Sequence, residues 1–201
     1  MSDATRWDER YAAADQVWSV EPNQFVASYC EGLPPGRAVD LAAGEGRNAL
    51  WLASLGWDAT AVDFSAVGLE RAGESAKARN LEVELVPADL RSYVPEAGAF
   101  DLVLIAYLHL PAEDREVILR NAAAAVAPGG TFFLVGHDLT NIADGHGGPQ
   151  DPSVLSTPDE VAALVSPPLV VSEAKVVARH VTVDGEPKTA LDTIVVATQA
   201  G

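Results

Sequence analysis

The sequence predicts an α/β protein with a doubly wound, three-layer architecture: a mostly parallel sheet of seven strands that ends in an antiparallel C-terminal hairpin. Two observations lead to this prediction. Short apolar runs alternate with stretches of helical period along most of the chain, and the run 38–41 passes through a glycine turn into a helix. The composition agrees, because 201 residues with 48% hydrophobic and 21% charged content are normal for one globular domain with a full core.

The individual elements follow from the apolar spacing and from helix-ending signals. Two short helices are expected first, at 4–14 and 23–30, and Pro34 and Pro35 then interrupt the chain. Pro128-Gly129-Gly130 is expected to close a helix and to precede a strand. Strands and helices alternate between these points: the strands are predicted at 38–41, 58–62, 82–86, 100–106 and 131–135, and the helices at 47–55, 66–79 and 113–126.

The last third of the chain predicts one more helix and the hairpin. Thr157 and Pro158 form a helix start with a cap residue and a proline at the first helical position. Apolar segments near 170–180 and 191–198 predict two antiparallel strands at the edge of the sheet. We therefore expect a single domain over 1–201, with a helical cap at 1–32, a cofactor-binding core at 37–138, and a substrate loop with the hairpin at 139–201.

Charge and cysteine content narrow the class of protein. The net charge of −16 repels phosphate backbones, and no run of Lys and Arg offsets it, so a nucleic-acid partner is not expected. The longest apolar run, 102–107, is too short to cross a bilayer, and the first ten residues lack the apolar core of a signal peptide. The single Cys30 excludes an internal disulfide and a cysteine-based zinc site. We expect a cytoplasmic monomer or homodimer without a bound metal and without membrane association.

The glycine turn after the first strand predicts a nucleoside-bearing ligand. Gly44 and Gly46 have no Cβ, so the backbone can approach a ligand closely, and the helix that begins at Arg47 offers unpaired N–H groups. The turn alone does not decide between NAD and another nucleoside-bearing cofactor. Its glycine spacing also fits an NAD site, in which Asp63, nineteen residues after Gly44, would bind the ribose. Asp40, four residues before Gly44, favours a cationic or hydroxylated ligand over a pyrophosphate.

Asp40, Asp89 after the third strand, and Pro128-Gly129-Gly130 before the fifth together resemble the class I S-adenosylmethionine-dependent methyltransferases. The resemblance runs from Trp7 to about Gln199 and implies a Rossmann-like fold with S-adenosylmethionine as the cofactor. Segment 39–46 is similar to the first motif of the family, Asp-x-Gly-x-Gly-x-Gly, with Ala42 in place of its first glycine. We expect Ala42 to avoid a strongly left-handed conformation. Gly-Glu-Gly-Arg-Asn at 44–48 and Trp-Asp-Glu-Arg-Tyr at 7–11 resemble more narrowly the small tellurite-resistance and thiopurine-type methyltransferases.

The resemblance also implies roles for individual residues. Asp63 would accept hydrogen bonds from both ribose hydroxyls, Phe64 would pack on the adenine, and Asp89 would accept from the adenine amino group. A plainer interpretation makes Asp63 the cap of the following helix and Phe64 an ordinary core residue. The implied cofactor-binding set is Asp40, Ala42, Gly44, Gly46, Arg47, Asn48, Asp63, Phe64, Ala88, Asp89, Leu90, Ala106 and Tyr107.

Two histidines are candidates for a catalytic base. His109 and His137 follow the fourth and fifth strands, which should place both at the same end of the sheet, although a lone histidine is more often structural. The acceptor side is predicted to involve the Gly-rich loop at 141–149 and the N-terminal segment. The substrate or lid residues predicted there are Trp7, Arg10, Tyr11 and Trp18, and Trp7 with Tyr11 can equally staple the first helix to the core.

The sequence therefore predicts a methyltransferase that acts on a small-molecule acceptor by in-line displacement and produces S-adenosylhomocysteine. The acceptor atom stays open among sulfur, oxygen, nitrogen and a metalloid oxyanion. Two alternatives remain: an NAD(P)-dependent oxidoreductase, and a non-catalytic S-adenosylmethionine-binding protein. Asp40 and the absence of a Tyr-x-x-x-Lys pair weigh against the oxidoreductase.

Overall fold

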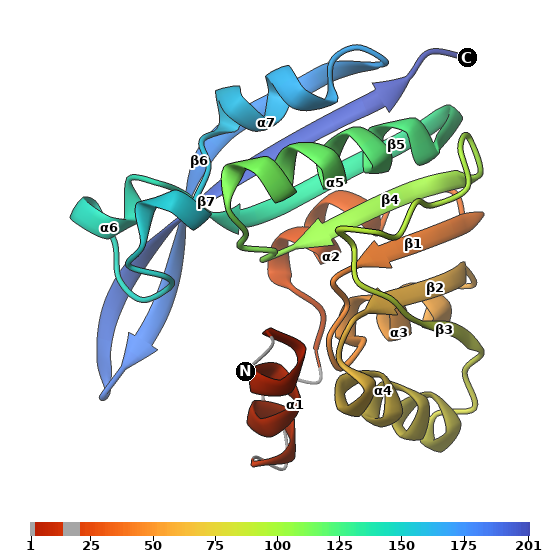
Figure 1. Ribbon diagram of the computed structural model, residues 1–201, viewed down its shortest axis with the longest axis horizontal. Helices are drawn as coiled ribbons and strands as arrows, with labels where there is room; N and C mark the ends of the chain where they lie inside the picture. Colours follow the sequence, from red (N-terminus) through yellow and green to blue (C-terminus); the bar gives the residue numbers. More distant parts are fainter. Residues whose placement is uncertain (1–2, 14–20) are drawn as a thin grey trace.

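The computed structural model describes residues 3–13 and 21–201 and contains one seven-stranded sheet in the order β3-β2-β1-β4-β5-β7-β6 (Figure 1). The first five strands are parallel, and β7 runs antiparallel to both β5 and β6. The predicted doubly wound α/β fold with a C-terminal hairpin is confirmed. The strands are β1 (Arg37–Leu41), β2 (Asp58–Asp63), β3 (Val83–Pro87), β4 (Phe100–Ala106), β5 (Val126–His137), β6 (Leu169–Val183) and β7 (Glu186–Gln199).

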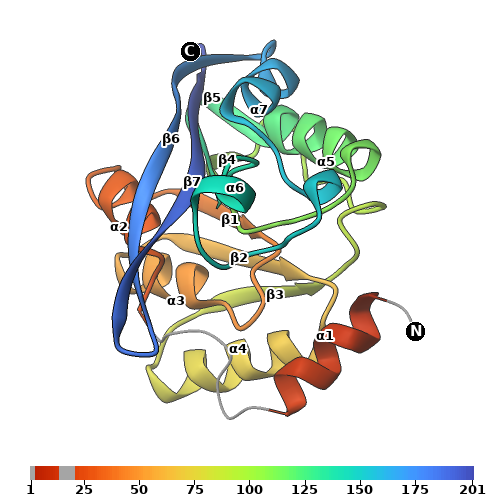
Figure 2. The ribbon, with the colours of Figure 1, turned by 90° about the vertical axis from the view of Figure 1, so that its left-hand side faces the viewer.

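Helices cover both faces of the sheet. Helices α2, α3 and α4 lie on one side, and α5 and α7 lie on the other (Figure 2). Among the described helices, none is both long enough and apolar enough to span a bilayer. The helices are α1 (Asp3–Ala12), α2 (Gln24–Cys30), α3 (Arg47–Ser54), α4 (Ala66–Ala78), α5 (Ala112–Ala125), α6 (Asn141–Asp144) and α7 (Pro158–Val165), with a short 3-10 helix η1 (Pro152–Val154).

Burial on both faces explains the continuous apolar runs of the central strands. Side chains alternate between the two faces of a strand, so the neighbours Phe132 and Phe133 of β5 enter different cores. Phe132 belongs to the core that includes Ile118 of α5, and Phe133 belongs to the core that includes Leu52 of α3. Both phenylalanines are fully buried. The sheet thus holds its carboxyl edge rigidly between two packed layers.

The C-terminal half differs from the prediction in three places. Strand β5 starts at Val126 and not at Thr131, because Val126 pairs with Phe100 before a bulge at Pro128-Gly129-Gly130. The hairpin strands are longer than predicted, since their outer parts pair only with each other and carry no continuous apolar run. Helices α6 and η1 lie inside the segment that was expected to be a loop. The predicted helix start at Thr157 is confirmed by a full capping box.

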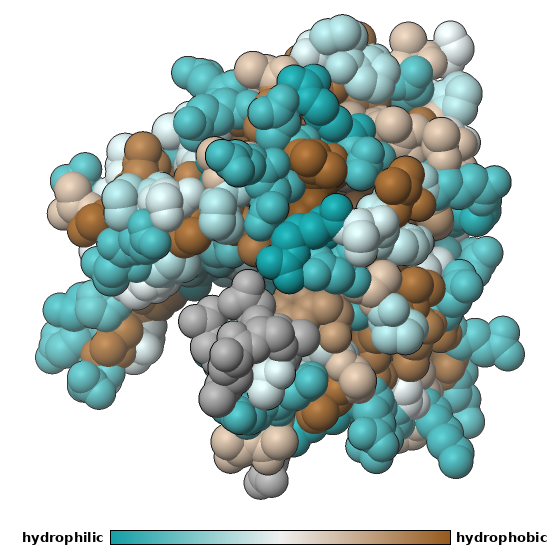
Figure 3. Space-filling view, viewed as in Figure 1, coloured by the Kyte–Doolittle hydropathy of each residue, from teal (hydrophilic) through white to brown (hydrophobic). Residues whose placement is uncertain are grey.

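The hairpin extends well beyond the sheet. Strand β7 pairs with β5 only where 131–137 face 192–198, whereas β6 and β7 continue together to the turn at 184–185. Its tip stands apart from the rest of the molecule in the space-filling view (Figure 3). The inner part of the hairpin brings residues from the end of the chain to the carboxyl ends of β4 and β5.

Candidate functional site

A cavity of about 580 Å³ opens at the carboxyl ends of the parallel strands, where β1 and β4 lie side by side and the connections leave in opposite directions. Parallel α/β sheets bind their ligands at such a switch point. The lining comes from the segments after four strands, from α1, and from the loop before α7. Its residues are Ala42, Ala43, Gly44, Arg47, Asn48, Asp63, Phe64, Asp89–Arg91, Ala106–Pro111, Trp7, Tyr11, Pro149, Asp151 and Val154.

The turn after β1 corrects one prediction. Ala42 has φ = 68°, so it takes the left-handed conformation that it was expected to avoid. The reason lies in its neighbours: the N–H groups of Ala42 and Ala43 both donate to the carbonyl of Val62, at 2.9 and 3.0 Å, which bends the chain sharply at the end of β1. Alanine tolerates this conformation at roughly 1–2 kcal/mol, because its side chain is the smallest that carries a Cβ.

The two glycines of the turn face different neighbours. Gly44 lines the cavity, and its N–H donates to Asp63 at 2.8 Å. Gly46 does not line the cavity. It caps α3 with φ = 73°, and a Cβ at this position would lie 2.8 Å from the Cβ of Ala72 on α4. Gly46 therefore serves the close packing of α3 against α4, whereas Gly44 is the glycine of the turn that lines the cavity.

Replacing Gly46 with alanine is expected to destabilise the fold by about 2–4 kcal/mol, from left-handed strain together with the overlap at Ala72. Gly56→Ala is the matched control, because Gly56 also has a positive φ, 91°, but has open space around its Cβ position. Urea unfolding of both variants measures the difference. Equal losses of stability in the two variants would show that the packing against α4 adds nothing.

Asp63 joins the first two loops of the cavity. Its Oδ2 accepts from the N–H of Gly44 and its Oδ1 from that of Ser65, both at 2.8 Å. Burial raises the pKa of Asp63, and these backbone hydrogen bonds oppose the rise. The cap of α4 is Ser65, whose hydroxyl accepts from the N–H of Gly68. Asp63 is therefore not the helix cap of the plainer interpretation, and its carboxylate lies at the cavity wall.

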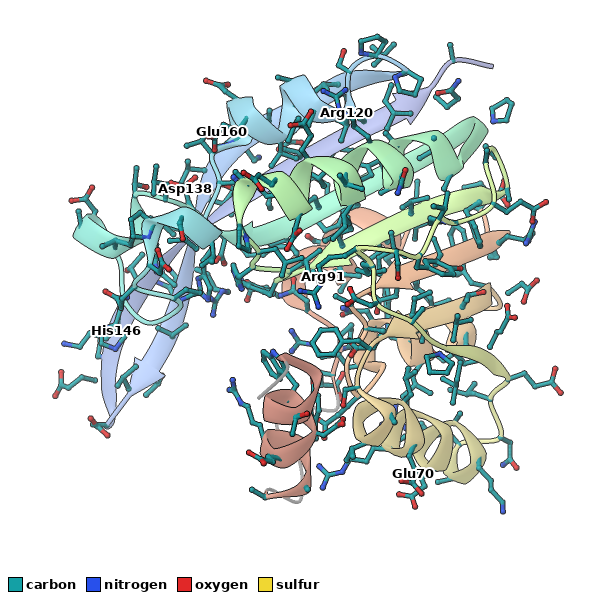
Figure 4. The ribbon with its side chains drawn as sticks, in the orientation of Figure 1. Glu70, Arg91, Arg120, Asp138, His146 and Glu160 are labelled. Atoms are coloured by element: carbon teal, nitrogen blue, oxygen red, sulfur yellow. The ribbon has the colours of Figure 1, made fainter. Side chains whose placement is uncertain are left out.

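The loop after β3 carries a polar pair at the cavity wall. Arg91 forms a forked ion pair with Asp89, with Nη2 2.6 Å from Oδ2, and lies at the centre of this face of the molecule (Figure 4). This pair lowers the pKa of Asp89. Leu90 is buried and lines the cavity, whereas Ala88 does not line it and instead donates its N–H to the carbonyl of Asp63.

Asp40 is a buried carboxylate behind the cavity wall. Only 1% of its surface is exposed, and among the described residues neither of its oxygens has a hydrogen bond of full geometry. Burial raises its pKa to about 7, and the neighbouring Arg47, Ala49 N–H and Asn48 amide only partly oppose the rise. Asn48 also accepts from the N–H of Asn23 at 2.9 Å, which fixes the start of α2. Asp40 can thus compensate one positive charge brought to this end of β1.

His109 and His137 lie together, as their positions after β4 and β5 predicted. Their rings stack with centroids 5.3 Å apart. His109 lines the cavity, and burial together with His137 lowers the pKa of His109 to about 4. The N–H of His137 donates to Nε2 of His109 at 3.3 Å. His146 lies on an exposed loop (Figure 4).

Helix α1 forms one side of the cavity. Trp7 and Tyr11 line it with their rings 5.6 Å apart, and Asp8 accepts from the hydroxyl of Ser65 at 2.6 Å. Tyr11 is buried, so it contributes to packing as well as to the wall. Arg10 is exposed, does not line the cavity, and stacks over Trp7 at 4.8 Å. The remaining predicted lid residue, Trp18, lies outside the described residues.

Sequence reasoning missed a polar cluster that the C-terminal hairpin brings to the cavity. Asp192 of β7 is fully buried and accepts from the hydroxyl of Tyr107 and from Nε of Arg179. Tyr107 lines the cavity with φ = 59°, and burial with Asp192 raises its pKa far above the ordinary value. The one signal in the sequence is an acidic residue within the apolar run 190–197. It could not reveal which residues would surround that acid.

Residues 38–130 match a protein family described as a methyltransferase domain. The demethylmenaquinone methyltransferase of Thermus thermophilus is 38% identical over 103 residues, which cover 50% of this chain and 47% of that enzyme. Across the first curated relatives, the matched part of the chain spans about a third to a half of their length, from 32% to 47%.

Solved structures share the fold over a longer stretch. TehB from Haemophilus influenzae superimposes with a TM-score of 0.73 at 18% identity, over 89% of this chain and 62% of that one. A protein studied for the conversion of a disulfide bond into a thioacetal group during echinomycin biosynthesis has a TM-score of 0.78 at 16% identity, over 99% and 93% of the two chains. Identities this low show a common fold. The similarity of fold therefore extends to the C-terminal hairpin, beyond the matched family segment.

Proposed function

We propose that the chain is a class I S-adenosylmethionine-dependent methyltransferase that transfers a methyl group to a small-molecule acceptor, and the match of residues 38–130 to a methyltransferase domain supports this. The cofactor supplies an electrophilic methyl group on a sulfonium centre. The protein then has to bind both molecules, align the acceptor atom for in-line displacement, and take a proton from acceptors that arrive protonated. The products are the methylated acceptor and S-adenosylhomocysteine.

The observation that carries this proposal is the buried carboxylate of Asp40 beside the glycine turn. Among the described residues its oxygens have no hydrogen bond of full geometry, and its pKa is raised, which suits the cationic methionine end of the cofactor and not a pyrophosphate. Asp63 faces the same cavity with its carboxylate held by two backbone N–H groups, which leaves lone pairs for a ribose diol. Phe64 and Leu90 provide apolar surface for the adenine, and Asp89 with Arg91 provides its polar border.

The other end of the cavity supports an apolar acceptor. Once the residues proposed for the nucleoside are set aside, the remaining lining includes Trp7 and Tyr11 of α1, the segment after β4 and the loop before α7. The apolar members of the last two segments are Leu108, Leu110, Pro111, Pro149 and Val154. Such walls favour a compact apolar or aromatic molecule, since a strongly hydrated ion would lose its water there without compensation. Ala106 and Tyr107 lie between the two ends, where the methyl group has to pass.

Calorimetric titration tests the cofactor. We expect S-adenosylmethionine and S-adenosylhomocysteine to bind at least about 100-fold more tightly than NAD, which corresponds to roughly 2.7 kcal/mol. Binding of NAD without binding of the other two would overturn the proposal in favour of an oxidoreductase. A screen of phenol, thiol, amine and metalloid acceptors with product mass detection then tests methyl transfer. Tight cofactor binding with no methylated product would favour a binding protein without activity.

A further inference from the structure

Asp192 is the centre of the polar cluster that the hairpin brings to the cavity. Its Oδ2 accepts from the Tyr107 hydroxyl at 2.9 Å and from Nε of Arg179 at 2.6 Å, and its Oδ1 lies 3.2 Å from Nδ1 of His137. The carboxylate is fully buried. The cluster therefore joins Tyr107, which directly follows β4, to residues of β5, β6 and β7 around one negative charge.

The pairing fixes the proton on one nitrogen of His137. Among the described residues, neither Nδ1 of His137 nor Oδ1 of Asp192 has a hydrogen bond of full geometry, both atoms are buried, and they lie 3.2 Å apart. Because a buried polar group left unpaired is unfavourable, we infer that these two atoms satisfy one another. Because the carboxylate only accepts, Nδ1 carries the hydrogen, and Nε2 holds the free lone pair of the neutral ring.

His109 has the opposite arrangement. Its Nε2 already accepts the backbone N–H of His137, so its hydrogen is on Nδ1 and its lone pair is occupied. The ring can donate a hydrogen bond into the cavity, but it offers no lone pair to an incoming proton. Of the two stacked imidazoles, only His137 is prepared to act as a base.

A glycine packs against the ring of His137. Gly148 has φ = 73°, and a Cβ there would lie 2.7–2.9 Å from Cδ2, Cγ and Nε2 of His137. His137 does not itself line the cavity, but the stacked His109 and Pro149, the residue after Gly148, both do. The His137 side chain retains 13% exposure although Asp192 has none. The ring therefore adjoins the place proposed for the acceptor.

We propose that His137 takes the proton from a protonated acceptor and that Asp192 is the positioning residue that holds it for this step. The inference rests on the proposed function. The acceptor's O–H or S–H bond breaks as its proton moves to Nε2, and the freed electron pair forms the new bond to the methyl carbon. The methyl–sulfur bond breaks with its electrons left on sulfur. Asp192 compensates the imidazolium, which later releases the proton to water.

Two acceptors separate a base from a merely structural histidine. 2-Naphthol is protonated at pH 7.5 and needs a base, whereas 4-nitrothiophenol is already ionised. We expect His137→Gln to slow methylation of 2-naphthol by about 100-fold and that of 4-nitrothiophenol by less than about 5-fold. His180→Gln, on the exposed outer hairpin, is the matched control and should change neither rate. Equal losses with both acceptors, or no methylation of 2-naphthol by the unchanged protein, would overturn the inference.

Nitrogen NMR of the imidazole rings tests the role of Asp192 without an acceptor. We expect the hydrogen of neutral His137 on Nδ1 in the unchanged protein, and a mixture of both tautomers in Asp192→Asn. A hydrogen on Nε2 in the unchanged protein would overturn the assignment. Calorimetry with S-adenosylmethionine on the same samples separates this inference from the proposed function. If the unchanged protein does not bind S-adenosylmethionine, the proposed function is wrong. If it binds but the tautomers or the rates differ from those expected, only the role of His137 is wrong.

Discussion

Asp63→Ala is expected to weaken S-adenosylmethionine binding by at least about 100-fold. Hydrogen bonds to a charged group contribute roughly 1.5–3 kcal/mol each, and the proposed site uses two of them on the ribose. The substitution also removes the acceptor for the N–H groups of Gly44 and Ser65, so the glycine turn loses one of its links to β2. Calorimetric titration of the variant measures the loss.

Asp58→Ala is the matched control for this substitution. Asp58 is the first residue of the same strand, β2, but it is exposed at the opposite edge of the sheet. We expect it to leave cofactor affinity unchanged. Asp63→Asn provides a second variant, because it keeps the size of the side chain and one acceptor oxygen if the alanine variant unfolds. An affinity within threefold of the unchanged protein in a folded Asp63 variant would show that Asp63 only organises the loops.

The central part of the fold could be predicted because its signals are local. Strands β1, β2 and β4 are short runs buried on both faces, and β3 is a short run at the edge of the sheet. Apolar spacing with glycine, proline or cap residues such as Ser65 at the boundaries located each of the four within one or two residues. The outer hairpin could not be predicted in full. There, alternate residues of β6 are exposed, and strand pairing between distant segments stabilises it in place of an apolar run.

The same distinction applies to the cavity: residues close together in the sequence could be predicted to meet, whereas residues that only strand pairing brings together could not. The turn 42–48 and Asp63 could be predicted as one ligand site, since a single strand–turn–helix unit and the next strand contain them. The conformation of Ala42 could not, because the carbonyl of Val62 on β2 imposes it. Asp192 could not be predicted either, because it acquires its role only when β7 joins β5 beside His137. The part of the cavity around β1 and β2 could therefore be predicted from the sequence better than the part beside the hairpin.

Asp40→Asn is expected to stabilise the ligand-free protein at pH 8 and to weaken the binding of the cofactor. Burial raises the pKa of Asp40 from 3.8 to about 7, so the folded state binds this proton more tightly than the unfolded state does. The stability contributed by the group is therefore fully present below pH 4 and is lost as the pH rises through 7. The full loss is up to about 4 kcal/mol, at 1.36 kcal/mol per pKa unit. A neutral asparagine avoids this loss of stability because it does not ionise.

Urea unfolding between pH 5 and pH 8 separates this effect from the other consequences of the substitution. Those other consequences do not depend on pH, whereas the stability advantage of Asp40→Asn should grow by roughly 2–3 kcal/mol across this range. A constant difference between the two proteins would mean that Asp40 is not neutral in the folded state, and the argument for a cationic ligand would lose its basis.

The same carboxylate links cofactor binding to proton release. If the cationic methionine end of S-adenosylmethionine binds beside Asp40, the carboxylate has to ionise on binding, and its proton leaves to the buffer. We expect the affinity of the unchanged protein to rise by up to about tenfold per pH unit between pH 5.5 and pH 7, and about one proton to be released at pH 6. Titrations in buffers of different ionisation enthalpy measure that proton.

Asp40→Asn should bind the cofactor more weakly and release no proton, because a buried amide can neither ionise nor compensate the ligand's charge. Proton release that persists in this variant would assign the linkage to another group, such as Asp63.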